Sequence, residues 1–249
     1  MNERRSRFGP LPLVFLLLPG LAPAATYNFV GTASQETGGT LYTEHHRIEG
    51  NCQEGVFRPG THQVEYRKPG QPEAFASKQM SYDPSPIRPS FTFRQPTFNE
   101  VVEVRYPRPE TLVVDWQKPG DGREQFTVSL TPDLVVDSGF DNFVRRHWQQ
   151  VTKGESVNFR FLAPTRGEHY AFVLEPVTHS GVKADHTVQI RPTGMVLRFL
   201  VDPIILGYTD SGALSDYLGL TNIRKNADEN YTAHIRYTVK TSPDCELTP

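Results

Sequence analysis

The histidines are the side chains best suited to metal or acid–base chemistry, and they are scattered rather than grouped. None of the eight stands in an H-x-H or H-E-x-x-H pattern or in a Cys/His spacing typical of metal ligands. His45 and His46 are the tightest cluster, but neighbouring residues of a strand point to opposite faces. We therefore predict no metal ion and no other cofactor, and we place the histidines at the surface or in turns.

His147 is the candidate for acid–base catalysis, because it lies within a helical pattern where Asp141 or Glu155 would complete a dyad. The corresponding hypothesis is an envelope hydrolase that uses His147 with Asp137 or Glu155. Asp141 and Glu155 are better explained as a helix cap and a helix-end charge. No serine-nucleophile elbow, phosphate loop, dinucleotide fingerprint or EF-hand occurs. We therefore predict no catalytic residue and expect the protein not to be an enzyme.

Aromatic side chains alternate along several predicted strands, and they either line a cavity for an acyl chain or pack a core. Core packing is the plainer interpretation, and a pocket is the alternative. Asn222-Ile223-Arg224 and Asp202-Pro203 set polar groups beside these strands, as a structural ion pair or turn or as contacts to a head group. The candidate ligand-binding residues are Trp148, Phe159, Phe161, Phe172, Phe199 and Tyr208.

One helix must position these residues, because residues 137–155 are the only segment with a strong helical period. Ser138 is the predicted N-cap, Asp141 completes a capping box, and Gly154 supplies the stop. Burial of the apolar face requires a large apolar partner, for which a curved sheet is the obvious candidate. The residues of this face are Phe140, Phe143, Val144, Trp148 and Val151, at spacings of three and four.

The rest of the chain reads as strands separated by Gly- and Pro-containing turns. Alternation is clearest at residues 157–161 and 170–174, and residues 195–201 form a strand that is apolar on both faces. The Pro-rich segment 82–89 is predicted to be an extended loop at a sheet edge, or a lid. The fold class is mostly β (β-rich α+β): a large curved antiparallel sheet or half-open barrel of about a dozen strands, with one central amphipathic helix.

The amino-terminal residues predict the compartment. Three arginines precede an apolar run from Leu11 to Leu21, and Ala22-Pro23-Ala24-Ala25 offers a cleavage site. Residues 1–25 are therefore a predicted secretory signal peptide, and residues 26–249 a single β-rich domain. No later segment is apolar enough to span a bilayer. In a Gram-negative bacterium the mature protein is expected to be periplasmic.

Charge and cysteine content fit this compartment. Removal of residues 1–25 takes away three arginines and one glutamate, which moves the formal net charge from −2 to −4. This acidic excess argues against a nucleic-acid partner. Cys52 and Cys245 are an even pair in an oxidising compartment, which favours a disulfide over two free thiols. Such a bond would fasten the C-terminal tail to the first hairpin.

Several segments together carry a resemblance to known proteins. They are Leu41-Tyr42-Thr43-Glu44-His45, Gly139-Phe140-Asp141-Asn142-Phe143-Val144-Arg145, Gly154-Glu155, Phe161-Leu162-Ala163-Pro164-Thr165-Arg166, Val201-Asp202-Pro203-Ile204 and Leu218-Gly219-Leu220-Thr221-Asn222-Ile223-Arg224. The chain resembles a family of uncharacterised secreted proteins of Gram-negative bacteria, which implies no particular activity. More distantly, its order of strands, helix and strands is similar to that of the half-barrel carriers that shuttle lipoproteins across the periplasm.

These observations lead to three hypotheses. The first is a non-enzymatic periplasmic protein that binds or carries a lipid or another apolar small molecule on the concave face of the sheet. The second is a structural or assembly factor of the envelope whose edge strand or loop 82–89 docks a protein partner. The third is the envelope hydrolase built around His147. The sequence itself names neither a ligand nor a partner.

Overall fold

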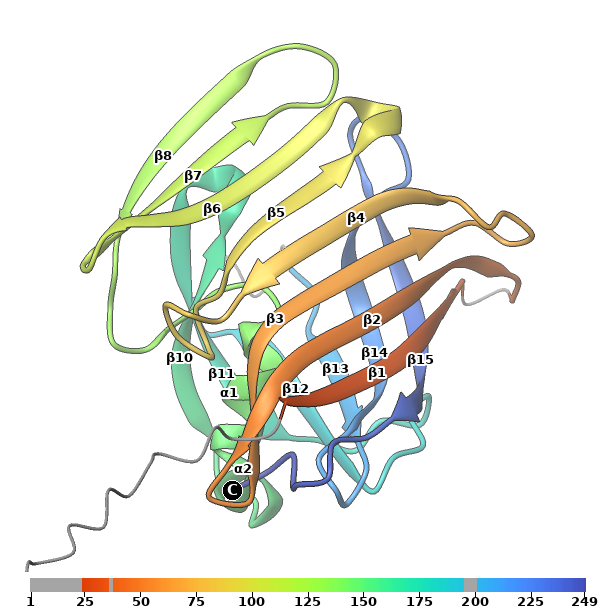
Figure 1. The fold of residues 1–249 in the computed structure, drawn as a ribbon, viewed down its shortest axis with the longest axis vertical. Coiled ribbons are helices and arrows are strands. Elements are labelled where there is room, and N and C mark those ends of the chain that lie inside the picture. Colours follow the sequence, from red (N-terminus) through yellow and green to blue (C-terminus); the bar gives the residue numbers. More distant parts are fainter. Residues whose placement is uncertain (1–23, 36–37, 195–200) are drawn as a thin grey trace, which may run out of the picture.

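The computed structural model describes residues 24–35, 38–194 and 201–249, and they form one 15-stranded sheet that curves without closing (Figure 1). The strands are β1 (Ala24–Ser34), β2 (Thr40–Gln53), β3 (Val56–Arg67), β4 (Ala74–Ser81), β5 (Ser90–Gln95), β6 (Glu100–Arg108), β7 (Thr111–Gln117), β8 (Arg123–Ser129), β9 (Leu134–Val135), β10 (Val157–Ala163), β11 (Glu168–Pro176), β12 (His186–Pro192), β13 (Ile204–Tyr208), β14 (Leu214–Arg224) and β15 (Asn230–Thr241). The predicted fold class is confirmed, whereas the strand predicted at 195–201 lies almost entirely outside the described residues.

The order of strands in the sheet follows the order in the sequence, with one exception. The exception is the pair β1–β15, which joins the first and last strands in the middle of the sheet. All neighbours are antiparallel except β9 and β10. The two free edges are therefore β8 and β9, from the middle of the chain. The Phe126 ring of β8 packs on Gly167, in the turn between β10 and β11.

The predicted single helix is two short helices, α1 (Gly139–Arg146) and α2 (Trp148–Thr152), separated at His147. Ser138 occupies the N-cap position as predicted, but its hydroxyl donates to the Asp137 carboxylate and makes no capping hydrogen bond to the backbone. Asp141 makes no capping box, since its carboxylate pairs with Arg145. Gly154 has a φ of 93°, and the predicted C-terminal stop is confirmed.

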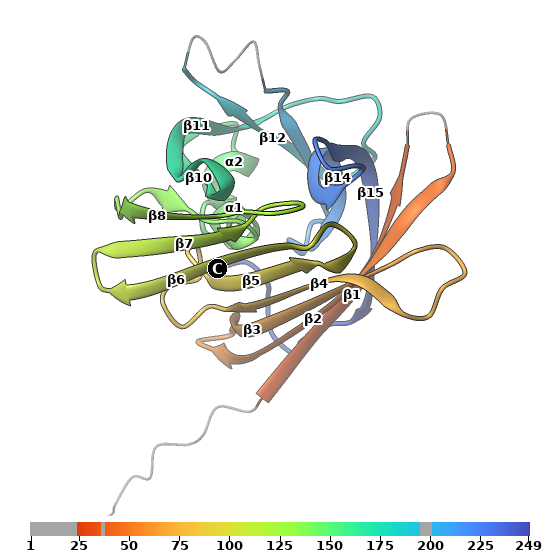
Figure 2. The same ribbon diagram turned by 90° about the horizontal axis from the view of Figure 1, so that it is seen from above.

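Both helices lie on the concave side of the sheet, as the view from above shows (Figure 2). Phe143, Val144 and Val151 are buried, whereas Phe140 and Trp148 are partly buried. This face packs against apolar side chains of β10 to β14, as its period predicts. Each fully buried large side chain stabilises the fold by about 1.5 to 3 kcal/mol at most. None of the helices in the described ranges is long and apolar enough to cross a membrane.

The Pro-rich loop 82–89 is not at a sheet edge, because the two strands that it joins, β4 and β5, pair with each other in the interior of the sheet. Instead it clamps the start of α1. The carbonyl of Ile87 accepts from the amide of Val136 at 3.0 Å, and the carbonyl of Pro86 accepts from the Asn142 side chain at 3.0 Å. The loop therefore closes one end of the barrel against the helices.

The predicted disulfide between Cys52 and Cys245 is formed, with a Cα–Cα distance of 6.0 Å. Beside it, Glu246 donates its amide to the carbonyl of Gly55 and accepts from the amide of Phe57. The segment after β15 is thus fastened to the hairpin of β2 and β3, at the end of the barrel that also holds the helices.

Candidate functional site

The predicted ligand-binding aromatics lie together, in a packed cluster beside the helices. Phe159, Phe172 and Tyr208 are buried, Trp148 and Phe161 are partly buried, and Phe199 lies outside the described residues. Their rings contact one another and the helices: the centroids of Phe159 and Phe172 are 6.0 Å apart, and those of Trp148 and Tyr208 are 5.8 Å apart. Ligand binding by this set stays a prediction.

A cavity of about 740 Å³ opens at the other end of the barrel. Strand β10 leads away from α2 to the short 3₁₀ helix η2 (Pro164–Arg166), and the cavity lies between η2 and the turn from β14 to β15. We call it the mouth. Its lining is Gln35, Thr165, Arg166, Leu220, Arg224, Lys225, Asp228, Glu229, Asn230, Tyr231 and Thr232.

The mouth contains an apolar side chain that the fold leaves in solvent. Leu220 is 56% exposed, although leucine side chains of this sheet are otherwise mostly buried. Tyr231 also lines the mouth; it is partly buried and packs on the interior cluster of the N-terminal strands, with its ring centroid 6.3 Å from that of Tyr42. The lining of the mouth is therefore mostly polar, with Leu220 and Tyr231 as its two large apolar side chains.

A buried ion pair at the mouth joins strand β14 to strand β6. Arg224 of β14 donates to both carboxylate oxygens of Glu100 of β6, at 2.6 and 2.7 Å. Trp116 donates to the same carboxylate at 3.0 Å, and the Gln95 side chain bonds to Glu100 and to the backbone amide of Arg224. A bidentate pair of this kind fixes the relative geometry of the two side chains. Arg224 thus forms the structural ion pair considered for it from the sequence.

A second group of buried charges fills the centre of the barrel. Lys78 of β4 donates to both oxygens of Asp137, at 2.8 and 2.9 Å, and the exposed fractions of the two side chains are 3% and 9%. Asn222 and Ser138 also donate to Asp137. Burial alone would raise the pKa of the Asp137 carboxyl, but Lys78 and the hydrogen bonds of Ser138 outweigh it and hold this pKa below its ordinary value.

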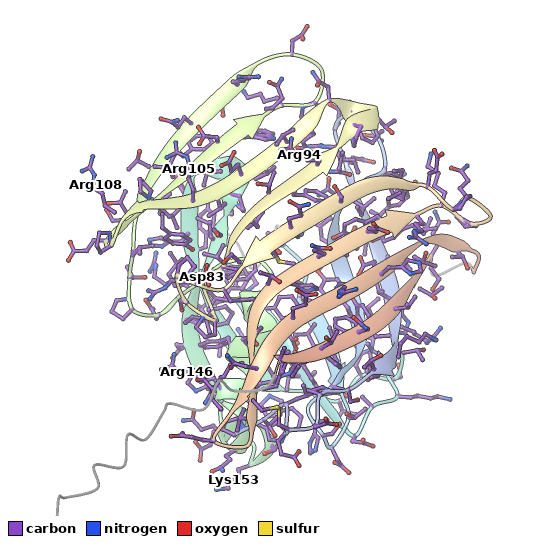
Figure 3. All side chains as sticks on the ribbon, viewed as in Figure 1. Asp83, Arg94, Arg105, Arg108, Arg146 and Lys153 are labelled. Atoms are coloured by element: carbon purple, nitrogen blue, oxygen red, sulfur yellow. A yellow bond between two sulfur atoms is a disulfide. The ribbon has the colours of Figure 1, made fainter. Side chains whose placement is uncertain are left out.

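Helix α1 presents charge to the same interior. Arg145 pairs with Asp141 at 2.9 Å and donates to the carbonyl of Gly212. Tyr208 donates to the Asp141 carboxylate at 3.2 Å, and the Tyr27 ring lies 5.7 Å from the Arg145 guanidinium. The neighbouring Arg146 points outward into solvent, as Lys153 does (Figure 3). The polar face of α1 is thus built into the barrel rather than displayed at its surface.

Two histidines complete this interior, which corrects the prediction that the histidines lie at the surface. The Nδ1 of His46 and the Nε2 of His62 are 2.9 Å apart, and His62 is 4% exposed. His46 bonds through Nε2 to Glu44 at 3.0 Å, and the Nδ1 of His62 lies 3.3 Å from the Tyr82 hydroxyl. Tyr237 also donates to Glu44. The signal for this arrangement was the alternation of β2, which puts Glu44 and His46 on one face.

The dyad considered from the sequence is not assembled. The Nδ1 of His147 bonds to the Gln150 side chain at 2.6 Å, whereas Asp141 bonds to Arg145 and Asp137 to Lys78. Glu155 is exposed. In the described ranges, no three His, Cys, Asp or Glu side chains are arranged to hold a metal ion.

Fold and site together define an open, curved β-sheet with helices on its concave side and a mouth at one end. No protein-family model and no curated protein matches the chain. Among solved structures, it is similar to a β-barrel-like protein of domain of unknown function DUF1849 from Brucella abortus, at 13% identity over 88% of this chain and 96% of that chain, with a TM-score of 0.39.

The chain is also similar to a domain described as that of an outer membrane lipoprotein-sorting protein from Vibrio parahaemolyticus. The identity is 10%, the coverage is 88% of this chain and 83% of that chain, and the TM-score is 0.28. The two neighbours are of the two kinds named from the sequence, a domain of unknown function and a lipoprotein-sorting domain.

Proposed function

We propose that this protein is a non-enzymatic periplasmic protein that binds an apolar ligand, such as a lipid acyl chain, on the concave side of its sheet. The observation that carries the proposal is Leu220, which is 56% exposed within a cavity of about 740 Å³ at the open end of the barrel. Small-molecule sites combine apolar contacts with a few polar groups that fix the orientation of the ligand. The mouth offers Leu220 and Tyr231 as apolar contacts among polar side chains.

The ligand enters at the mouth in this proposal. Its apolar chain contacts Leu220 and Tyr231, while its polar end meets the rim formed by Arg166, Lys225 and Asp228. The predicted aromatic set around Trp148 is packed tightly against the helices at the opposite end. These aromatic side chains would contact the ligand only if its acyl chain extended past the buried charged groups in the centre of the barrel. The mouth is therefore the first place to test.

The periplasmic location rests on the predicted signal peptide together with the disulfide. Disulfides persist in oxidising compartments such as the periplasm and are rare in the cytosol. A carrier in the periplasm has to shield an acyl chain from water between two membranes. An open barrel with an apolar interior is suited to this task.

The test is native mass spectrometry with organic extraction of the protein purified from the periplasm of its host without detergent. We expect a lipid or another apolar molecule at near-stoichiometric amount. In Leu220→Glu the occupancy should fall at least about tenfold, the cost of placing a charge where an apolar chain binds. The matched control is Val239→Glu, because Val239 is 36% exposed at the far end of β15.

Two outcomes would overturn the proposal. A wild-type mass without any bound molecule would disprove the binding of an apolar ligand, and a protein partner would then be sought by crosslinking. Equal loss of bound ligand in Leu220→Glu and Val239→Glu would show that the mouth is not the binding site. In addition, loss of ligand in a folded Trp148→Ala variant, with Leu220→Glu unaffected, would place the ligand at the predicted aromatic cluster instead.

A further inference from the structure

Four polar side chains form one continuous hydrogen-bonded chain inside the barrel, away from the mouth. It runs from Tyr82 through His62 and His46 to Glu44. The Glu44 carboxylate can only accept, so His46 donates to it from Nε2. With both rings neutral, His62 donates from Nε2 to the bare Nδ1 of His46, and the Tyr82 hydroxyl donates to the bare Nδ1 of His62.

All four ring nitrogens of this chain already take part in hydrogen bonds. Two of them carry hydrogens and two accept, so a further proton has to displace an existing hydrogen bond. One added proton must end on the Nδ1 of His62. The positive charge then lies on His62, or on His46 if the hydrogen between the two rings moves to the Nδ1 of His46. In both arrangements the Nδ1 of His62 becomes a donor toward the Tyr82 oxygen. The Tyr82 hydroxyl must then turn to another acceptor.

Tyr82 connects this event to helix α1. It is the first residue of the loop 82–89, whose Ile87 and Pro86 carbonyls hold the start of the helix. Tyr82 is itself buried, and it interacts electrostatically with Asp141 of α1. A change in the hydrogen bond of Tyr82 therefore acts on the segment that fastens α1 to the wall of the barrel.

The surroundings of His62 oppose a positive charge on its ring. Burial, followed by the charges of His46, Lys78 and Arg145, holds the pKa of His62 well below its ordinary value. By contrast, His46 lies 3.0 Å from the Glu44 carboxylate. The titratable and charged groups that interact with the two rings are Glu44, His45, Lys78, Tyr82, Asp141, Arg145 and Tyr237.

We propose that the chain Tyr82–His62–His46–Glu44 is a pH-sensitive switch that couples the wall of the barrel to helix α1. Uptake of one proton by the histidine pair turns the Tyr82 hydroxyl and loosens the contact between the loop 82–89 and the helix. Because the unfolded chain protonates His62 more readily than the folded one, stability falls as the pH falls below about 6.5, the unfolded histidine value.

The hydrogen positions are tested on the wild-type protein by long-range ¹H–¹⁵N spectra of ¹⁵N-histidine-labelled protein. At pH 7.5 we expect His46 and His62 both as neutral tautomers with the hydrogen on Nε2. His62 should stay neutral well below pH 6.5, the value of an unperturbed histidine. A hydrogen on the Nδ1 of His62 at pH 7.5, or titration of His62 near pH 6.5, would overturn the switch.

The coupling to α1 is tested by hydrogen exchange of residues 139–152, expressed as protection factors to remove the intrinsic pH dependence of exchange. Between pH 7.5 and 5 the wild-type values should fall at least about tenfold more than those of β6, which report the general loss of stability. In Tyr82→Phe, which has no hydroxyl to turn, this excess fall should be abolished. An excess fall of equal size in Tyr82→Phe would disprove the coupling.

A control variant separates this switch from general acid sensitivity. His234→Gln removes a partly buried histidine that bonds to Asp216 at 2.8 Å, outside the chain of four. It should keep the fall in protection of α1. If Tyr82→Phe fails to fold, the tautomers and titration of the wild-type histidines decide the proposal without it.

Discussion

At the scale of single residues, the interior of this barrel is held by charge as well as by apolar packing. Lys78 and Asp137 are paired with little solvent around them, and removal of one partner would leave an uncompensated charge there. We expect Lys78→Met to lower the free energy of unfolding by about 3 to 5 kcal/mol, measured by urea denaturation at pH 7. The double variant Lys78→Met/Asp137→Asn should recover part of this loss. A double variant less stable than Lys78→Met would contradict the argument.

The pH dependence of this pair differs from that of the histidines. Because the pKa of Asp137 is lowered in the folded state, its contribution to stability is complete above the unfolded value of about 3.9 and is lost as the pH falls through the folded value. Acid unfolding should therefore show two phases, with the histidine phase at higher pH. In Asp137→Asn only the histidine phase should remain in a urea titration series from pH 8 to 2.

At the scale of elements, the fit between the loop 82–89 and helix α1 depends on Gly139. A Cβ at this position would lie 2.2 Å from the carbonyl oxygen of Ile87, which is backbone and cannot turn aside. We expect Gly139→Ala to destabilise the fold by about 1 to 3 kcal/mol, measured by thermal and urea unfolding. Gly194→Ala is the matched control, since nothing lies within 4 Å of its added Cβ. Equal stability of the two variants would show that the loop moves freely.

At the scale of the whole molecule, the disulfide is the strongest single constraint. It joins residues separated by 193 positions and fastens the segment after β15 to the hairpin of β2 and β3. In the chain-entropy model, Cys52→Ala/Cys245→Ala should lower the free energy of unfolding by about 5 kcal/mol, measured by denaturation. Reduced wild type serves as the control and should match the variant. A variant as stable as the oxidised wild type would contradict this expectation.

The sequence predicted those features that depend on local pattern. The helical period correctly placed Phe143, Val144 and Val151 against the sheet, and the even cysteine count correctly indicated the disulfide. The break at His147 was missed, because an apolar period continues across a short break without change. Asp141 was assigned to a cap from its spacing, whereas its partners Arg145 and Tyr208 belong to tertiary structure.

The central polar groups could be predicted only in part, for a physical reason. Alternation along β2 already puts Glu44 and His46 on one face, and these polar residues interrupt a face that Tyr42 and Ile48 bury. Their partners His62 and Tyr82 lie on β3 and beyond β4, and the register between strands decides whether they meet. The mouth depends likewise on a turn and a 3₁₀ helix that are far apart in the sequence.

The pairing of β1 with β15 has a consequence for the order of events during synthesis. A strand can pair with its sequence neighbour as soon as both have been made, so β1 to β8 can assemble progressively. The second edge of β1 stays without its partner until β15 has emerged, when the growing sheet acquires its most distant contact. Since Cys245 follows β15, oxidation of the Cys52–Cys245 pair marks the chains in which this last step has taken place.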